Sequence, residues 1–76
     1  MGRYAVIGLG KFGTAVARTL EELGHQVIAI ERDGDLVDRL ADCASKVLEG
    51  DATDPAVLKA AGAGDVDGAV VSTAEN

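Results

Sequence analysis

The residues that could bind a phosphorylated ligand begin at a glycine-rich segment near the N-terminus. Gly8, Gly10 and Gly13 are spaced as G-x-G-x-x-G, with Lys11 and Phe12 between the last two glycines. An apolar run precedes this segment and a helical pattern follows it, which is the context in which such glycines bind phosphate. The glycines permit a tight turn, close approach of a pyrophosphate and close packing of the helix. The helix N-terminus and Lys11 would then face an anion; the alternative is a glycine turn without a ligand.

An acid stands at the end of the next apolar run. Glu31 follows Gly13 at the spacing where dinucleotide-binding folds place the acid that accepts hydrogen bonds from the adenosine ribose. A carboxylate at this place repels a 2′-phosphate and favours NAD over NADP, although the neighbouring Arg32 could hold a 2′-phosphate. The alternative is a solvated acid at the end of a strand.

Two later segments could complete the same site. Asp51, Ala52 and Thr53 follow the third apolar run. Asp51 or the Ala52 backbone could meet the adenine base, and Thr53 could orient the loop. The alternative is that Asp51 and Thr53 act only as turn and cap residues. Thr73 follows the fourth run, across the expected crevice from the glycines, and could touch ribose or phosphate.

The hydrophobic period alternates along the chain and predicts the elements that position these residues. Apolar runs predict strands at Tyr4–Ile7, Gln26–Ile30, Lys46–Glu49 and Gly68–Ser72. The first run is continuous rather than alternating, which is typical of a strand buried on both faces of a parallel sheet.

Three helices are expected between the strands. The first covers Lys11–Leu23 and ends before Gly24. Either Asp33 or Asp35 could cap the second. The buried stripe of that second helix is expected at Leu36, Val37, Leu40 and Ala41. The third helix starts at Asp54-Pro55, a cap followed by proline, and runs to about Ala61, with Gly62 as its stop.

The resulting order, βαβαβαβ, predicts parallel strands joined by right-handed crossovers. We therefore expect an α/β, Rossmann-like three-layer sandwich whose four strands lie in the order 3-2-1-4. With 76 residues, the chain is a single partial domain of this kind. The fourth strand would be an apolar edge, Ala69–Val71, and such edges invite pairing with another chain.

Composition excludes several classes of function. Seven basic and thirteen acidic residues give a net charge of −6, which argues against nucleic-acid binding and against an anionic membrane surface. The apolar runs are far too short for direct membrane insertion. One cysteine, Cys43, excludes an internal disulfide and a multi-cysteine zinc site. The free thiol and the lack of an export signal point to the cytoplasm.

Catalytic residues are not evident. His25 is the only histidine, and it precedes the second strand, at the amino end of the sheet, whereas ligands bind at the carboxyl end. Cys43 is expected to pack as a small apolar residue. The aspartates between positions 33 and 42 lack the pattern of a calcium loop. We therefore expect no enzyme and no metal site.

Taken together, these motifs resemble the KTN domain, also called the RCK or TrkA-N-like domain, of prokaryotic potassium transporters and channels. The resemblance rests on the glycine loop from Gly8 to Gly13, on Leu23–Val27, on Glu31 and on Gly50–Asp54. It covers nearly the whole chain. The family often has Arg in place of Lys11 and Asp in place of Glu31.

This resemblance implies a regulatory module rather than an enzyme. In the family, NAD(H), ATP or ADP binds in the crevice, and a ring of domains then gates an ion-conducting membrane partner. It implies phosphate contacts at the glycine loop, a ribose contact at Glu31 and adenine contacts at Asp51, Ala52 and Thr53. We expect NAD(H) or an adenine nucleotide (ATP, ADP or AMP) as ligand and a homo-oligomer as the assembly. We also expect this chain to be a truncated or engineered N-terminal part of a parent protein that binds a membrane potassium transporter subunit.

Two alternatives stay open at the level of sequence. The first is the N-terminal half of an NAD-dependent oxidoreductase, which would have the same glycine loop and the same acid. The second is a structural or assembly fragment that binds no nucleotide. A turnover assay on the longer parent protein separates the oxidoreductase from the regulatory module. A ligand titration separates the structural fragment from the regulatory module.

Overall fold

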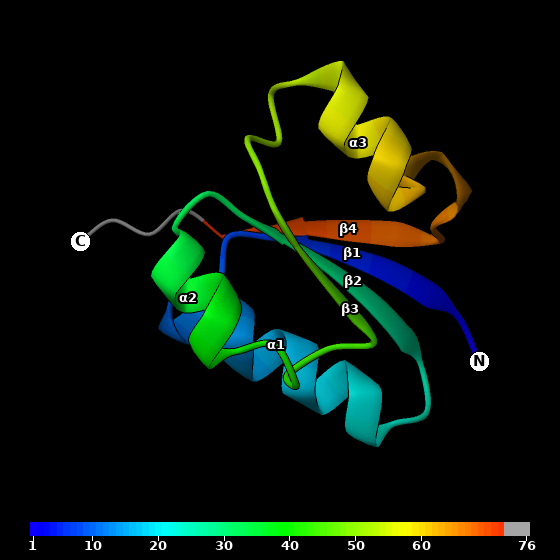
Figure 1. Cartoon of the computed structure of the whole chain (residues 1–76). Helices are drawn as coiled ribbons and strands as arrows, with labels where there is room; N and C mark the ends of the chain where they lie inside the picture. Colours follow the sequence, from blue (N-terminus) through cyan, green and yellow to red (C-terminus); the bar gives the residue numbers. More distant parts are fainter. Residues whose placement is uncertain (73–76) are drawn as a thin grey trace.

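The computed structural model describes residues 1–72 and shows a parallel sheet with helices on both faces (Figure 1). The strands are β1 (Arg3–Ile7), β2 (Gln26–Glu31), β3 (Lys46–Glu49) and β4 (Gly68–Val71). They lie in the order β3-β2-β1-β4, and every pairing is parallel. The Rossmann-like fold class and the strand order predicted from the sequence are therefore confirmed.

Helices α1 (Lys11–Glu22) and α2 (Gly34–Arg39) cover one face of the sheet, and α3 (Pro55–Ala61) covers the other (Figure 1). A short 3-10 helix, η1 (Ala63–Asp65), joins α3 to β4. Among residues 1–72, no helix is long and apolar enough to cross a membrane.

Strand β2 lies at the centre of the buried core and has apolar residues on both sides. Val27 and Ala29 pack toward α1 and α2, together with Val6, Leu9, Ala17 and Cys43. Ile28 and Ile30 pack toward α3, together with Ala61. Because successive side chains of a strand point to opposite faces, a continuous apolar run is what a strand covered on both faces requires.

The predicted helix starts are confirmed for α2 and α3. The Asp33 carboxylate accepts a hydrogen bond of 2.9 Å from the Asp35 backbone N–H, so Asp33 rather than Asp35 caps α2. Asp54 accepts a hydrogen bond of 2.9 Å from the Ala56 N–H and caps α3. Gly62 ends α3 with a φ of 74°, a left-handed conformation that glycine adopts without strain.

One local expectation was wrong, and one short element was not predicted. The second helix ends at Arg39, so Ala41 lies beyond it and is exposed instead of completing the buried stripe. Cys43, which follows a turn, is buried in its place. The chain leaves the helix early because it must turn back within six residues to enter β3 at Lys46. The 3-10 helix η1 was not predicted, since a single turn has no period to detect.

Strand β4 forms one edge of the sheet in the described part of the chain. It pairs with β1, and its outer side has no neighbouring strand among residues 1–72. Ala69 is exposed and Val71 is 66% exposed. The predicted apolar edge is therefore present, although the strand ends at Val71 rather than at Ser72.

The backbones of α1 and the loop after β1 touch where two glycines meet. A Cβ atom on Gly13 would lie 1.9 Å from the Gly8 carbonyl oxygen, and a Cβ atom on Gly8 would lie 1.8 Å from the Ser72 carbonyl oxygen. Gly8 also has a φ of +94°. Packing alone therefore requires glycine at both positions, whether or not a ligand binds.

We predict that Gly13→Ala destabilises the protein by about 1–3 kcal/mol, because the new methyl group has no room and overpacking outweighs the gain in helix propensity. Gly64→Ala is the matched control, since a Cβ atom there meets nothing within 4 Å. Urea unfolding followed by circular dichroism measures both. Equal stability of the Gly13 variant and the parent protein would contradict the close contact.

Candidate functional site

A crevice of about 370 Å³ opens at the carboxyl ends of the strands. The loops after all four strands contribute to its lining. The sequence-predicted residues that line it are Gly8, Glu31, Arg32, Asp51, Ala52 and Thr53, and Ile7, Ile30, Gly50 and Ser72 complete it. The fold thus brings six of the predicted residues together, from positions far apart in the sequence.

The other predicted glycine-loop residues form the start of α1 beside this crevice. Gly10 is the N-cap residue and makes no side-chain hydrogen bond to the first turn. Lys11 and Phe12 are exposed in that turn, and Gly13 is buried beneath it. Since the first N–H groups of a helix have no partner within the helix, α1 presents donors that no side chain caps.

Glu31 is buried, with 8% of its surface exposed, and its carboxylate holds two backbone groups. Oε1 accepts a hydrogen bond of 2.6 Å from the Leu9 N–H, and Oε2 accepts one of 2.9 Å from the Asp33 N–H. The carboxylate therefore ties the glycine loop and the cap of α2 to the end of β2. An ionised carboxylate has about four acceptor positions, so acceptor capacity remains for ligand hydroxyls.

Asp51 organises the loop after β3. Its Oδ1 accepts hydrogen bonds from the Thr53 N–H (2.9 Å) and the Thr53 hydroxyl (2.7 Å). These two bonds hold the pKa of the Asp51 carboxyl below its usual range. Arg32 Nη1 lies 3.9 Å from Asp51 Oδ2 with its side chain 76% exposed, so this ion pair across the rim is weak.

One site residue was missed by the sequence reasoning, and another lies outside the part of the chain that the structure describes. Ser72, buried at 8% exposure, was missed, although its place directly after β4 is the signal that could have found it. Thr73 lies outside the described residues, and its predicted role stays a prediction.

The two reactive side chains excluded from the site lie elsewhere. His25 precedes β2, at the opposite edge of the sheet, where its Nδ1 accepts a 2.9 Å hydrogen bond from the Gly2 N–H. Cys43 is buried, and this burial raises the pKa of its thiol. In the part of the chain described here, no three His, Cys, Asp or Glu side chains are grouped to hold a metal ion.

We predict that Glu31→Gln lowers the free energy of unfolding by about 1–3 kcal/mol without any ligand, because a glutamine amide cannot accept both backbone N–H bonds. Glu49→Gln is the matched control, since Glu49 is the exposed parallel partner of Glu31 on β3. Urea unfolding measures both variants. A loss no larger than that of the control would contradict the structural role of the carboxylate.

We also predict a specific acid sensitivity at Asp51. Because its pKa is lowered in the folded protein, its hydrogen bonds stabilise the fold above the unfolded-state pKa of about 4. That contribution is lost as the pH falls through the lower folded-state value. Urea midpoints measured from neutral pH into this acid range should fall less steeply for Asp51→Asn than for the parent. Parallel curves would show that the Thr53 bonds carry no pH-dependent stability.

A parallel sheet in the order 3-2-1-4, with a glycine turn and a buried acid at its carboxyl edge, defines a Rossmann-like domain. Within this class, the sequence matches the model of the TrkA-N domain over residues 4–76. The chain belongs to the TrkA-N domain family.

Curated relatives agree with this assignment. The Ktr system potassium uptake protein C of Bacillus subtilis (strain 168) is 42% identical over 73 residues, which cover 96% of this chain. The Ktr system potassium uptake protein A of the same organism is 30% identical over 74 residues, or 97% of the chain. The chain spans 33% of the length of each.

A relative of another class aligns with a shorter part of the chain. A glycerol-3-phosphate dehydrogenase [NAD(P)+] of Staphylococcus aureus (strain JH9) is 44% identical over 43 residues, covering 57% of this chain and 13% of that protein.

Proposed function

We propose that this chain is the nucleotide-binding part of a regulatory domain of a potassium uptake system. The observation that carries the proposal is the convergence of Gly8, Glu31 and the Asp51–Thr53 loop on one crevice beside the uncapped start of α1. Membership of the TrkA-N family and the names of the Ktr relatives support the connection with potassium uptake.

The crevice suits the adenosine diphosphate half of a nucleotide. Phosphates would accept hydrogen bonds from the free N–H groups at Gly10, Lys11 and Phe12, where the helix dipole adds positive potential. Glu31 would accept hydrogen bonds from the ribose hydroxyls, and the loop at Asp51 would lie beside the adenine. The volume of about 370 Å³ is near the lower end of the range of small-ligand sites, about 300–1,000 Å³. ADP, ATP, AMP or the ADP half of NAD(H) is therefore the proposed ligand.

We further propose that the chain is not an enzyme. A hydride-transfer site needs a positioned acid or base near the substrate. His25 lies at the opposite edge of the sheet and Cys43 is buried in the core. The dehydrogenase relative aligns with the chain over 43 residues at 44% identity, a length that fits a common cofactor-binding half.

The assembly proposals follow from the exposed sheet edge and the relatives. We propose that residues 1–76 are a single partial domain of a longer cytoplasmic protein that associates with a membrane transporter subunit. Val71, 66% exposed on β4, belongs to an edge that can pair with another strand, which supports self-association.

We predict that ADP and NADH bind the crevice and that NADPH binds more weakly, because its 2′-phosphate meets the Glu31 carboxylate. Isothermal titration calorimetry with NADH, NADPH, ATP, ADP and AMP measures this. Altering the ligand tests the ribose contact without disturbing the protein: 2′-deoxy-ADP should bind about tenfold more weakly than ADP, the scale of one lost charged hydrogen bond.

Two results would contradict the proposal. Binding of no nucleotide by the folded chain would show that the crevice alone does not form a nucleotide site. Equal affinity for ADP and 2′-deoxy-ADP would remove the ribose role of Glu31 while leaving the rest of the site standing.

A further inference from the structure

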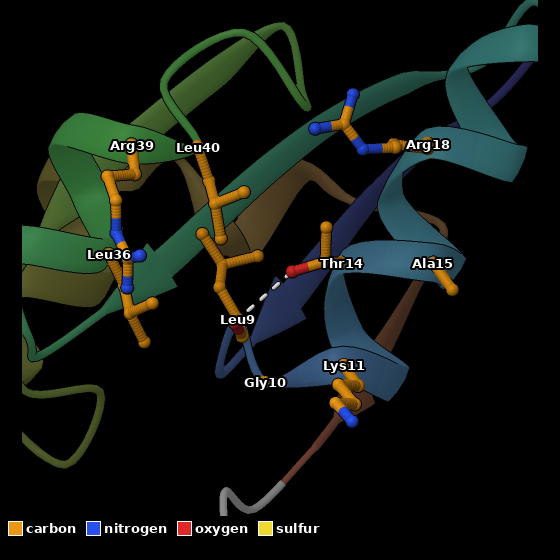
Figure 2. Close-up of a pocket in the computed structure, with 9 residues that line it drawn as sticks. All are labelled: Leu9, Gly10, Lys11, Thr14, Ala15, Arg18, Leu36, Arg39 and Leu40. Atoms are coloured by element: carbon orange, nitrogen blue, oxygen red, sulfur yellow. Dashed lines mark hydrogen bonds between the residues drawn. The ribbon is translucent and has the colours of Figure 1, made fainter.

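A second, larger hollow lies between α1 and α2, on the face of the sheet that these two helices cover (Figure 2). This groove has a volume of about 760 Å³. The glycine loop divides it from the crevice: Gly8 lines the crevice, whereas Leu9, Gly10 and Lys11 line the groove. The two hollows are therefore distinct surfaces on either side of one turn.

Three leucines form the apolar part of the groove. Leu9 is buried at 1% exposure, and Leu36 in α2 and Leu40, the C-cap residue that follows α2, are half-buried. Figure 2 shows the side chains of Leu9 and Leu40 pointing toward one another, with Leu36 on the α2 side of the groove beside Arg39. The nearby Thr14 hydroxyl donates a hydrogen bond of 3.2 Å to the Leu9 carbonyl oxygen. Its proton is therefore not available to a ligand. The groove therefore offers a ligand mainly apolar contact with the leucines and polar contact with the cationic side chains of its rim.

The rim of the groove is positively charged. Lys11 and Arg18 reach it from α1 and Arg39 from α2, and all three are exposed. They are three of the seven basic residues in a chain of net charge −6. Among residues 1–72, no acidic side chain lines the groove. The ion pair found in this part of the chain joins Arg32 to Asp51 and involves none of the three cations of the rim.

We propose that this groove binds a small organic anion with an apolar or aromatic body. An apolar floor inside a rim of three cations complements a ligand that has one hydrophobic part and one or more negative groups. The groove volume lies within the range of small-molecule sites, about 300–1,000 Å³, which favours such a ligand over a protein partner. The assignment does not require a nucleotide in the crevice, and the two sites share Gly10 and Lys11, which line the groove and are also among the phosphate contacts proposed above.

The test compares two probes that share a ring system and differ in charge. 8-Anilinonaphthalene-1-sulfonate (ANS) carries a sulfonate, and N-phenyl-1-naphthylamine is its neutral counterpart. Fluorescence titration without nucleotide should show one ANS site per chain and weaker binding of the neutral probe. Arg18→Gln and Arg39→Gln should each weaken ANS binding by about two- to fivefold, the range of one exposed charge pair, and more salt should weaken it further.

Lys46→Gln is the control variant, because Lys46 is an exposed cation at the start of β3 and does not line the groove. It should leave the ANS affinity unchanged. The three substituted side chains are exposed, so the variants should stay folded, and their NMR spectra verify this. In the chain without substitutions, ANS should shift the methyl signals of Leu36 and Leu40.

Four results would overturn the assignment. These are unchanged ANS affinity in both arginine variants, equal binding of the neutral probe, binding only at the highest probe concentrations, and shifts confined to Gly8 and Asp51 in the crevice. Sedimentation provides a fifth: a concentration-dependent dimer that shifts the same leucine methyls without ANS would make a second copy of the chain the occupant.

Discussion

The contact between α1 and the loop after β1 is the constraint on which the rest of the structure depends. Gly13 lies against the Gly8 carbonyl, and Gly8 lies against the Ser72 carbonyl, so a helix, a turn and the end of β4 meet without intervening side chains. This close approach sets the N-terminus of α1 at the carboxyl edge of the sheet. Both hollows are formed by that turn, the crevice on one side and the groove on the other.

The Glu31 carboxylate is the second constraint, and it combines structure with the proposed function. A buried charge is costly unless it is hydrogen-bonded, and here the N–H groups of Leu9 and Asp33 supply the bonds. The same bonds fix the glycine loop relative to α2. A ribose hydroxyl would therefore meet an acceptor that is already held in place, which lowers the ordering cost of binding. The residue that stabilises the ligand-free edge is also the one that the ligand would use.

Local signals in the sequence predict most of the fold, because strands, caps and faces are encoded by neighbouring residues. The buried run of β2 and the caps at Asp33 and Asp54 are of this kind. The end of α2 was not predicted, because tertiary packing places Cys43 rather than Ala41 in the core. The motif also predicted that Glu31 and the glycine loop would meet. It did not show that the acid bonds the loop itself, since that depends on side-chain reach across 22 positions.

The two hollows differ in charge, and this difference separates the ligands that they suit. Glu31 and Asp51 line the crevice, so phosphate binding beside it must rely on the N–H groups of α1 rather than on a surplus of cationic side chains. The acids suit ligand groups that donate hydrogen bonds, such as sugar hydroxyls and an adenine amine. The groove has the opposite lining, with Arg18 and Arg39 beside leucines and, among residues 1–72, no acidic side chain. Lys11 stands where the two surfaces meet, so a nucleotide phosphate at the start of α1 and an anion in the groove would compete for its single charge.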